Sequence, residues 1–310
     1  MRSTLVRSLA LGAFVAAGCG QSGRGGGGGT GWPGLDDLAA PPDAASTNHG
    51  PGDFAVTGDP QQGCGELQDC YTIYAHSDTV LYHVDLKNKA LVEVGPFNAP
   101  KVNGKDESMT DLAVASDGTI YTISHTDLYT ADPMDGHVTL VASVQACGMY
   151  AVALTFTPDG TLYAGDYGGA FCKIDPKSGK VTQIAASLGQ GMALAGDIVA
   201  VADGTIFGTA QLVADGSNGP TALDNFLVKI NPATGQATQI GKTGFPKMFG
   251  VAFDNGQVYG FTHDGSGDVC TIDPKTGAGT KYATFKDQSG KGISFAGAGV
   301  NSMVPAPPVM

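Results

Sequence analysis

The chain has 310 residues, 42% of them hydrophobic, which is enough to bury a full core in one or two domains. Its 47 glycines and its low share of charged residues, 15%, favour a turn-rich all-β protein over a helical one. The formal net charge of −12 argues against nucleic acid or an anionic lipid surface as a partner, because either would require a basic patch and none is visible.

Residues 1–18 have the layout of a targeting segment. Arg2 and Arg7 provide a short positive region, and an apolar run too short to span a bilayer as a stable helix follows. The next residues, Ala16-Ala17-Gly18-Cys19, resemble the lipobox of bacterial lipoproteins, although Ala16 stands where that family usually has Leu. The resemblance implies that Cys19 is lipidated, with palmitate, and becomes the mature N-terminus. An ordinary secretory signal is the alternative.

The residue after the cysteine, Gly20, resembles the sorting signal of outer-membrane lipoproteins rather than that of inner-membrane ones. We therefore expect a lipoprotein of the bacterial cell envelope that faces the periplasm or the cell surface. Residues 19–63 show no sustained period and are rich in Gly and Pro, which is the composition of a flexible tether. Residues 304–310 form a short Pro-rich tail.

Between these ends, two kinds of turn signal recur with a period of about 40 to 50 residues, which is typical of repeat architectures. Asp-Gly or Asn-Gly between apolar runs predicts a hairpin, because both residue types tolerate positive φ. The hairpin signals are Asp117-Gly118, Asp159-Gly160, Asp203-Gly204 and Asn255-Gly256. The second signals are Asp132-Pro133, Asp175-Pro176, Asn231-Pro232 and Asp273-Pro274. Each unit therefore supplies four strands, A to D, joined by tight turns.

Four complete units span residues 111–145, 151–187, 194–241 and 249–285. Residues 71–95 supply three more strands, and residues 292–300 supply one. Three strands plus one make a fifth unit closed by both ends of the chain, which removes exposed sheet edges. We therefore predict an all-β fold, a five-bladed β-propeller over residues 64–303, with six blades as the alternative.

The repeats resemble those of a broad set of bacterial secreted β-propellers, with an Asp-Gly-Thr-Leu-Tyr strand start and an Ile-Asp-Pro-x-Thr-Gly turn. The match runs through residues 159–163 and 272–277, and the resemblance covers about residues 71–300. These motifs specify turns and core, so the resemblance implies a fold and no activity.

In such a blade the A–B and C–D turns lie on one face of the ring, and the B–C loops and D–A links lie on the other. The first face has short, uniform turns, which we interpret as structural. The second face varies between units, and long irregular loops on a rigid scaffold usually carry function. We expect a ligand there to contact Met109, His125, Tyr167, Gln211, Asp215, Asn218, Asn225 and His263.

Methionine and histidine recur on that face. Met109, Met149, Met192 and Met248 precede the A strands, with Lys291 in the fifth place, and they predict either an apolar ring at the channel mouth or gap filling between blades. His76, His125 and His263 occupy equivalent sites in three neighbouring units and are candidate metal ligands. Strand B lies outside the channel strand, however, so solvent-facing loop histidines are the alternative.

The cysteines indicate an oxidising compartment. Cys64 and Cys70 lie close together at the start of the fold and are expected to pair, and Cys147 and Cys172 flank the first hairpin of one unit and are a second candidate pair. Cys270 would then be a free, buried thiol.

We find no zinc motif and no nucleophile elbow, which favours a non-enzymatic protein. The leading hypothesis is a lipid-anchored binding scaffold, a monomer without a cofactor, that holds a protein or carbohydrate ligand outside the cytoplasm. The membrane is contacted only through the anchor. The rival is a metal-dependent hydrolase or lactonase of the propeller kind, for which the candidate ligands are Glu107, Asp111 and Asn301.

Overall fold

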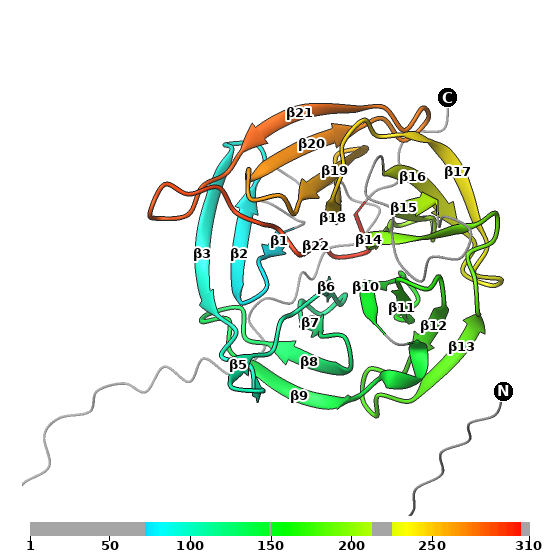
Figure 1. The fold of residues 1–310 in the computed structure, drawn as a ribbon, viewed down its shortest axis with the longest axis horizontal. Coiled ribbons are helices and arrows are strands. Elements are labelled where there is room, and N and C mark those ends of the chain that lie inside the picture. The colour runs from blue at the N-terminus through cyan, green and yellow to red at the C-terminus, as the bar shows by residue number, and fades with distance from the viewer. Residues whose placement is uncertain (1–71, 149, 213–224, 305–310) are drawn as a thin grey trace, which may run out of the picture. The chain divides into compact units, whose positions relative to one another are not determined.

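The computed structural model describes residues 72–148, 150–212 and 225–304. In these ranges, five four-stranded antiparallel sheets surround a common centre, so the protein is a five-bladed β-propeller (Figure 1). This confirms the predicted fold and excludes the six-bladed alternative. The described residues include one short 3-10 helix, Gln145–Cys147, and among them no helix has the length and apolar character needed to cross a bilayer.

The blades are numbered I to V in chain order, and in each the innermost strand is given first. Blade I consists of β22 (Gly297–Gly299), β1 (Ile73–His76), β2 (Val80–Asp85) and β3 (Ala90–Pro96). Blade II consists of β6 (Asp111–Val114), β7 (Ile120–Ile123), β8 (Asp127–Ala131) and β9 (Val138–Ser143). Blade III consists of β10 (Ala151–Phe156), β11 (Leu162–Asp166), β12 (Phe171–Ile174) and β13 (Val181–Ala185). Blade IV consists of β14 (Met192–Ala200), β15 (Ile206–Leu212), β16 (Phe226–Ile230) and β17 (Ala237–Lys242). Blade V consists of β18 (Met248–Asp254), β19 (Gln257–Thr262), β20 (Asp268–Ile272) and β21 (Gly279–Thr284).

Blade I closes the ring as predicted. Its innermost strand β22 comes from the end of the described chain and pairs antiparallel with β1 from its beginning, with Gly299 opposite Tyr74 and Gly297 opposite His76. A further parallel bridge joins Asn301 to Val114 in blade II. Because both ends of the described propeller enter one sheet, blade I has an inner strand and the ring of sheets is continuous.

In the recurring turns, aspartate side chains accept hydrogen bonds from backbone N–H groups of the same turn. The carboxylate of Asp117 accepts the Thr119 N–H at 3.0 Å, and Gly118 has a φ of +86°, which favours glycine. The Asp175 carboxylate likewise accepts the N–H groups of Lys177 and Ser178, and these hydrogen bonds lower its pKa. Aspartates on this face therefore hold turns together, as the sequence predicts.

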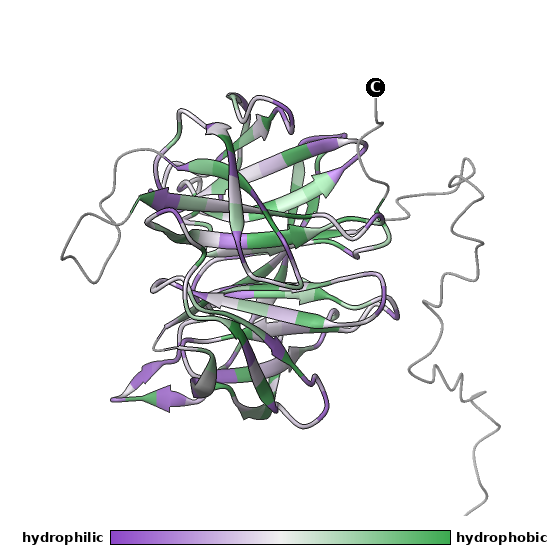
Figure 2. Ribbon diagram, turned by 90° about the vertical axis from the view of Figure 1, so that its right-hand side faces the viewer, coloured by the Kyte–Doolittle hydropathy of each residue, from purple (hydrophilic) through white to green (hydrophobic). Residues whose placement is uncertain are grey.

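The core lies between blades and along the inner strands. Every residue of β10 and of β14 is buried, whereas the outer strands alternate between partly buried and exposed residues. Aromatic side chains pack from one blade onto the next, as in the stacked pair Phe207 and Phe253, whose ring centroids are 6.0 Å apart. Hydrophobic residues follow the strands and hydrophilic residues gather at the turns (Figure 2). The apolar runs of the sequence thus become inter-blade packing.

The long link between blades I and II contains a hairpin that the sequence analysis did not identify. Strands β4 (Lys101–Val102) and β5 (Lys105–Asp106) pair antiparallel, and an ion pair joins Lys101 to Asp106 at 3.2 Å. Asn103 and Gly104 between them both have positive φ, 53° and 79°, as a type I′ turn requires. The Asn103-Gly104 dipeptide is the sequence signal from which this hairpin could have been predicted.

Candidate functional site

A pocket of about 250 Å³ opens on the face that carries the B–C loops and D–A links. Loops between second and third strands supply Asp78, His125, Tyr167 and His263 to its wall. The link between blades I and II supplies Ser108, Met109 and Thr110, and Ala296 precedes β22. Inner-strand residues Val152, Gly196 and Phe249 complete the lining. The structure therefore brings four of the eight predicted ligand contacts, Met109, His125, Tyr167 and His263, to one pocket.

The two pocket histidines are held by the same kind of contact. His125 Nδ1 lies 3.3 Å from the Ala151 carbonyl oxygen in blade III, and His263 Nδ1 lies 3.0 Å from the Phe295 carbonyl oxygen ahead of β22. A carbonyl oxygen only accepts, so Nδ1 donates, and Nε2 of each ring has no hydrogen-bond partner among the described residues. Each imidazole is thus oriented by the neighbouring blade, with one nitrogen left for a ligand.

Aromatic rings fix one side of the pocket. The His263 ring stacks on Phe249, with centroids 4.7 Å apart and an interplanar angle of 14°, and Tyr167 approaches Phe249 edge-on at 6.5 Å. His125 makes a similar edge contact with Tyr150 at 5.2 Å. Burial raises the pKa of Tyr167, so its phenol keeps its proton at neutral pH. These packed rings make this wall of the pocket rigid.

Met109 is fully buried and its backbone N–H donates to the Asp78 carbonyl oxygen at 2.9 Å. Met192 and Met248 are also buried, each in a hydrophobic cluster between blades. Met149 lies outside the described residues. The three described methionines therefore fill gaps between blades, which was the second of the two interpretations, and Met109 reaches the pocket only as part of its floor. Lys291, the fifth member of the predicted set, lies in an exposed turn.

Two predicted ligand contacts belong to the framework instead. Gln211 is buried in β15, and its side-chain Nε2 donates to the Leu194 carbonyl oxygen at 3.3 Å. Asn225 is buried, and its Oδ1 accepts the Met248 N–H at 2.6 Å. One amide atom of each side chain is therefore bonded to the backbone, and neither residue lines the pocket. Asp215 and Asn218 lie outside the described residues.

The three candidate metal ligands do not converge. His125 and His263 line the pocket, but His76 is fully buried against Phe97, with Nδ1 2.8 Å from the Ser77 carbonyl oxygen. In the described residues no group of three or more His, Cys, Asp or Glu side chains is arranged to hold a metal ion. Burial lowers the pKa of His76 to about 4, so this ring is neutral at physiological pH. The metal prediction is therefore wrong for this trio.

Two buried carboxyl groups lie at the inner strands. Asp111 on β6 accepts the Leu112 N–H through Oδ1 and the Leu154 N–H of β10 through Oδ2, at 2.8 and 2.6 Å. Asp197 on β14 accepts the N–H groups of Val251 on β18 and Ala298 on β22 through Oδ2, at 2.6 and 3.2 Å. Inner-strand N–H groups that face the centre lack a neighbouring strand, and these carboxyl groups satisfy them. Together the two aspartates connect all five innermost strands.

The two carboxyl groups also interact with each other. Burial, and for Asp111 the nearby charge of Asp197, raise the pKa of both well above the ordinary value. Asp197 Oδ1 has no hydrogen-bond partner among the described residues, and a proton held between the two side chains would provide one. The pair is therefore a structural clamp in which one shared proton removes the repulsion between two carboxylates.

The three residues predicted as metal ligands of a hydrolase, Glu107, Asp111 and Asn301, all have partners within the protein. Both Asp111 oxygens accept backbone N–H groups, and Glu107 accepts the Tyr129 hydroxyl at 2.5 Å. Asn301 donates through Nδ2 to the Ala115 carbonyl oxygen and accepts the Met303 N–H through Oδ1. All three side chains are engaged in the framework. Sequence reasoning missed Asp197, although a carboxylate inside the apolar run of β14 was a usable signal.

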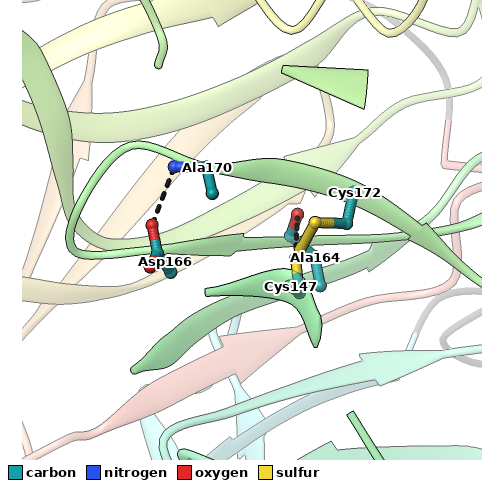
Figure 3. Close-up of a disulfide and its surroundings, with 5 residues drawn as sticks. All are labelled: Cys147, Ala164, Asp166, Ala170 and Cys172. Atoms are coloured by element: carbon teal, nitrogen blue, oxygen red, sulfur yellow. Dashed lines mark hydrogen bonds between the residues drawn. A yellow bond between two sulfur atoms is a disulfide. The ribbon is translucent and has the colours of Figure 1, made fainter. Parts of the chain in front are cut away.

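The cysteines behave as predicted where the structure describes them. Cys147 and Cys172 form a disulfide with Cα atoms 5.7 Å apart, which connects the link into blade III to its third strand (Figure 3). Beside it, Asp166 Oδ1 accepts the Ala170 N–H at 2.7 Å and holds the loop that carries Tyr167. Of the described cysteines, Cys270 is free and buried. Cys19, Cys64 and Cys70 lie outside the described residues.

Comparison with known proteins shows similarity of fold alone. No protein-family model matches the sequence, and no curated protein matches it. Among solved structures, a chain of a nidogen/laminin complex is 14% identical at a TM-score of 0.47, with 74% of this chain and 98% of that chain covered.

A protein of unknown function from Bacteroides thetaiotaomicron is 15% identical at a TM-score of 0.44, covering 72% of this chain and 61% of that chain. The virginiamycin B lyase of Staphylococcus aureus is 13% identical at 0.37, covering 68% of this chain and 64% of the lyase. This chain thus spans less than two thirds of the length of the latter two. We base no statement about function on these likenesses.

Proposed function

We propose that this protein is an extracytoplasmic binding module that holds its ligand in the pocket on the loop-rich face of the propeller. The observation that carries the proposal is the pocket itself, in which His125 and His263 from two blades each present an unengaged nitrogen. Pockets with a few convergent polar groups among apolar and aromatic walls are typical of binding sites. Either a carbohydrate or a projecting part of a protein is the expected ligand.

Its location follows from the cysteines and the first residues of the chain. The Cys147–Cys172 disulfide supports an oxidising compartment. The lipobox-like sequence that ends at Cys19 supports a lipid anchor in the cell envelope, and the outer membrane is the expected site. A propeller anchored in this way would present the pocket to ligands outside the cytoplasm. Metabolic labelling with palmitate, compared between the natural chain and Cys19→Ala, tests the anchor.

A tryptophan placed in the pocket tests the binding proposal. Ser108 is exposed at the pocket wall and its side chain forms no hydrogen bond with any described residue, so Ser108→Trp would fill the pocket without disturbing the core. The control is Ser178→Trp, the same change in an exposed turn on the opposite face. The full chain would be screened on a glycan array and against envelope proteins.

We expect binding that survives Ser178→Trp and disappears with Ser108→Trp. A third variant replaces residues 213–224 by a short Gly-Ser turn and keeps the structural residues Gln211 and Asn225. Binding that disappears only in this third variant would move the site from the pocket to that loop. Binding unaffected by all three changes, or no binding at all, would contradict the proposal.

A further inference from the structure

From the chemistry of the pocket wall we propose that the group bound there is a primary ammonium. This inference rests on the proposed binding function and narrows it to a ligand class. An ammonium group is a compact cation with three hydrogen-bond donors and no acceptor. The wall of the pocket has the complementary properties, which follow from three separate features of its lining.

The first feature is charge. Asp78, on the loop between β1 and β2, is an exposed acidic residue among those that line the pocket, and it forms no ion pair with any described residue. No Lys or Arg side chain from the described parts of the chain lines the pocket. A phosphate or carboxylate ligand would meet this negative charge without a compensating cation, whereas an ammonium group gains an attractive partner.

The second feature is the balance of donors and acceptors. His125 and His263 donate through Nδ1 to backbone carbonyls, and with the proton on Nδ1 an imidazole can offer a ligand an acceptor at Nε2. The Thr110 hydroxyl lies 2.8 Å from the Ala151 carbonyl oxygen and donates to the backbone, which leaves its lone pairs. With the Asp78 carboxylate, the wall therefore carries more acceptors than donors, and it favours a ligand that donates.

The third feature is the aromatic side of the pocket. Phe249 and Tyr167 lie within one packed cluster, and the His263 ring stacks on the Phe249 face. Aromatic rings attract cations through their quadrupole, and with the Phe249 face covered by His263 the ring left for such a contact in this cluster is that of Tyr167. Because His263 stacks on Phe249, stacking a sugar ring on that face is disfavoured.

The size of the pocket limits what enters. About 250 Å³ is smaller than the roughly 300 to 1,000 Å³ typical of drug-sized ligand sites. A single amine-bearing group therefore fits better than an oligomer. Two sources present such a group, an amino sugar and a lysine side chain, and the test below separates them.

The experiment measures binding of four probes to the full chain by calorimetry or ligand-observed NMR. Glucosamine and Nα-acetyl-lysine amide carry an ammonium group. N-acetylglucosamine and Nα,Nε-diacetyl-lysine amide are their neutral counterparts. We expect at least one ammonium probe to bind, and its neutral counterpart to bind at least tenfold more weakly. Binding of glucosamine would identify an amino sugar as the source of the ammonium group, and binding of Nα-acetyl-lysine amide would identify a lysine side chain.

The variants locate the charge. Asp78→Asn keeps the shape of the wall and removes its charge, so the affinity for the ammonium probe should fall at least tenfold. Asp106→Asn in the exposed β4–β5 hairpin removes the same charge elsewhere and should leave the affinity unchanged. Thermal unfolding of both variants checks that each is folded.

Two results would overturn the inference, and they differ in what else they affect. Equal binding of charged and neutral probes, unchanged by Asp78→Asn, would exclude ammonium recognition while leaving the pocket as a binding site. If none of the four probes binds, but Ser108→Trp abolishes binding of a ligand found in the screen, ammonium recognition is likewise excluded and the pocket remains a binding site. If no probe and no screened ligand depends on Ser108→Trp, both the inference and the proposed function fail.

Discussion

At the residue scale, the most consequential side chains are the two buried aspartates at the inner strands. A buried carboxylate is costly unless hydrogen-bonded or protonated, and this pair is both hydrogen-bonded and raised in pKa. Gly297 shows how closely the surroundings fit, because a Cβ there would collide with His76 Nε2 and the Asp111 side chain. The polar groups at the centre of the propeller are thus engaged in holding the inner strands together, and the pocket proposed as the ligand site is lined by other residues.

The proton held by this pair predicts a dependence of stability on pH. Both pKa values are raised in the folded protein, so above the unfolded carboxyl value of 3.8 the folded state binds more protons than the unfolded state. The stabilisation is therefore complete below that value and is lost as pH rises through the folded pKa, by up to about 1.4 kcal/mol per pH unit for one proton.

Asp197→Asn tests this linkage. An asparagine can accept the same N–H groups and donate an N–H to Asp111, so it imitates the protonated pair without titrating. We expect the free energy of unfolding of this variant, from denaturant curves at several pH values, to depend less on pH than that of the natural protein. Asp106→Asn, which removes an exposed charge, should keep the natural slope. Equal slopes for all three proteins would contradict the shared proton.

At the element scale, the blades share a plan but differ in their braces. In blade III the disulfide joins β12 to the link that enters the blade. Three residues after Cys147 in the sequence is Tyr150, whose ring contacts the ring of His125. In blade V the equivalent strand β20 carries Cys270, which is free, and burial raises the pKa of its thiol to about 12. A buried thiol with such a pKa is unreactive, so only blade III has a covalent brace among the described cysteines.

Removing the brace should destabilise the propeller. The bridge closes a loop with a sequence separation of 25, for which loop entropy predicts a loss of about 3 kcal/mol in the free energy of unfolding of the double variant Cys147→Ala, Cys172→Ala. Reductant should lower the stability of the natural protein and leave that of the double variant unchanged. Cys270→Ala is the control, and it should keep the sensitivity to reductant. If reductant leaves the free energy of unfolding of the natural protein unchanged, the disulfide does not contribute to its stability.

At the scale of the whole molecule, one short strand closes the ring. β22 supplies the inner edge of blade I and donates the Ala298 N–H to Asp197 of blade IV. It therefore connects the two ends of the propeller and joins blade I to blade IV. A closed ring has no exposed inner edge, so the blades are expected to unfold together rather than one by one.

Ala298→Pro should open the ring. Proline removes the N–H that Asp197 accepts and disturbs the pairing of β22 with β1, and a buried acceptor left unsatisfied costs about 1–3 kcal/mol. We expect a lower unfolding midpoint and faster hydrogen exchange in β1 to β3, measured by mass spectrometry. A chain that ends after Val304 is the control and should keep the natural exchange pattern. Unchanged exchange in blade I of Ala298→Pro would argue against closure by β22.

Much of this protein was readable from its sequence, because turns and strand periodicity are local. The Asp-Gly and Asp-Pro turns, the five blades, the strand shared between both ends and the Cys147–Cys172 bridge are all predicted from spacing and residue type. The loop-rich face was predicted for the same reason, since turn length follows from the repeat. Four candidate contacts on that face do line one pocket.

Other features depended on contacts between distant residues, which no local pattern encodes. Asp197 and Ala298 are 101 positions apart, and Asp111 and Leu154 are 43 apart, yet they meet at the inner strands. The burial of Gln211, Asn225 and His76, and the meeting of His125 with His263, likewise follow from how blades pack. The sequence by itself determined the repeat and its closure. Only the tertiary structure decided which side chains hold the ring and which line the pocket, because these contacts form between residues of different blades.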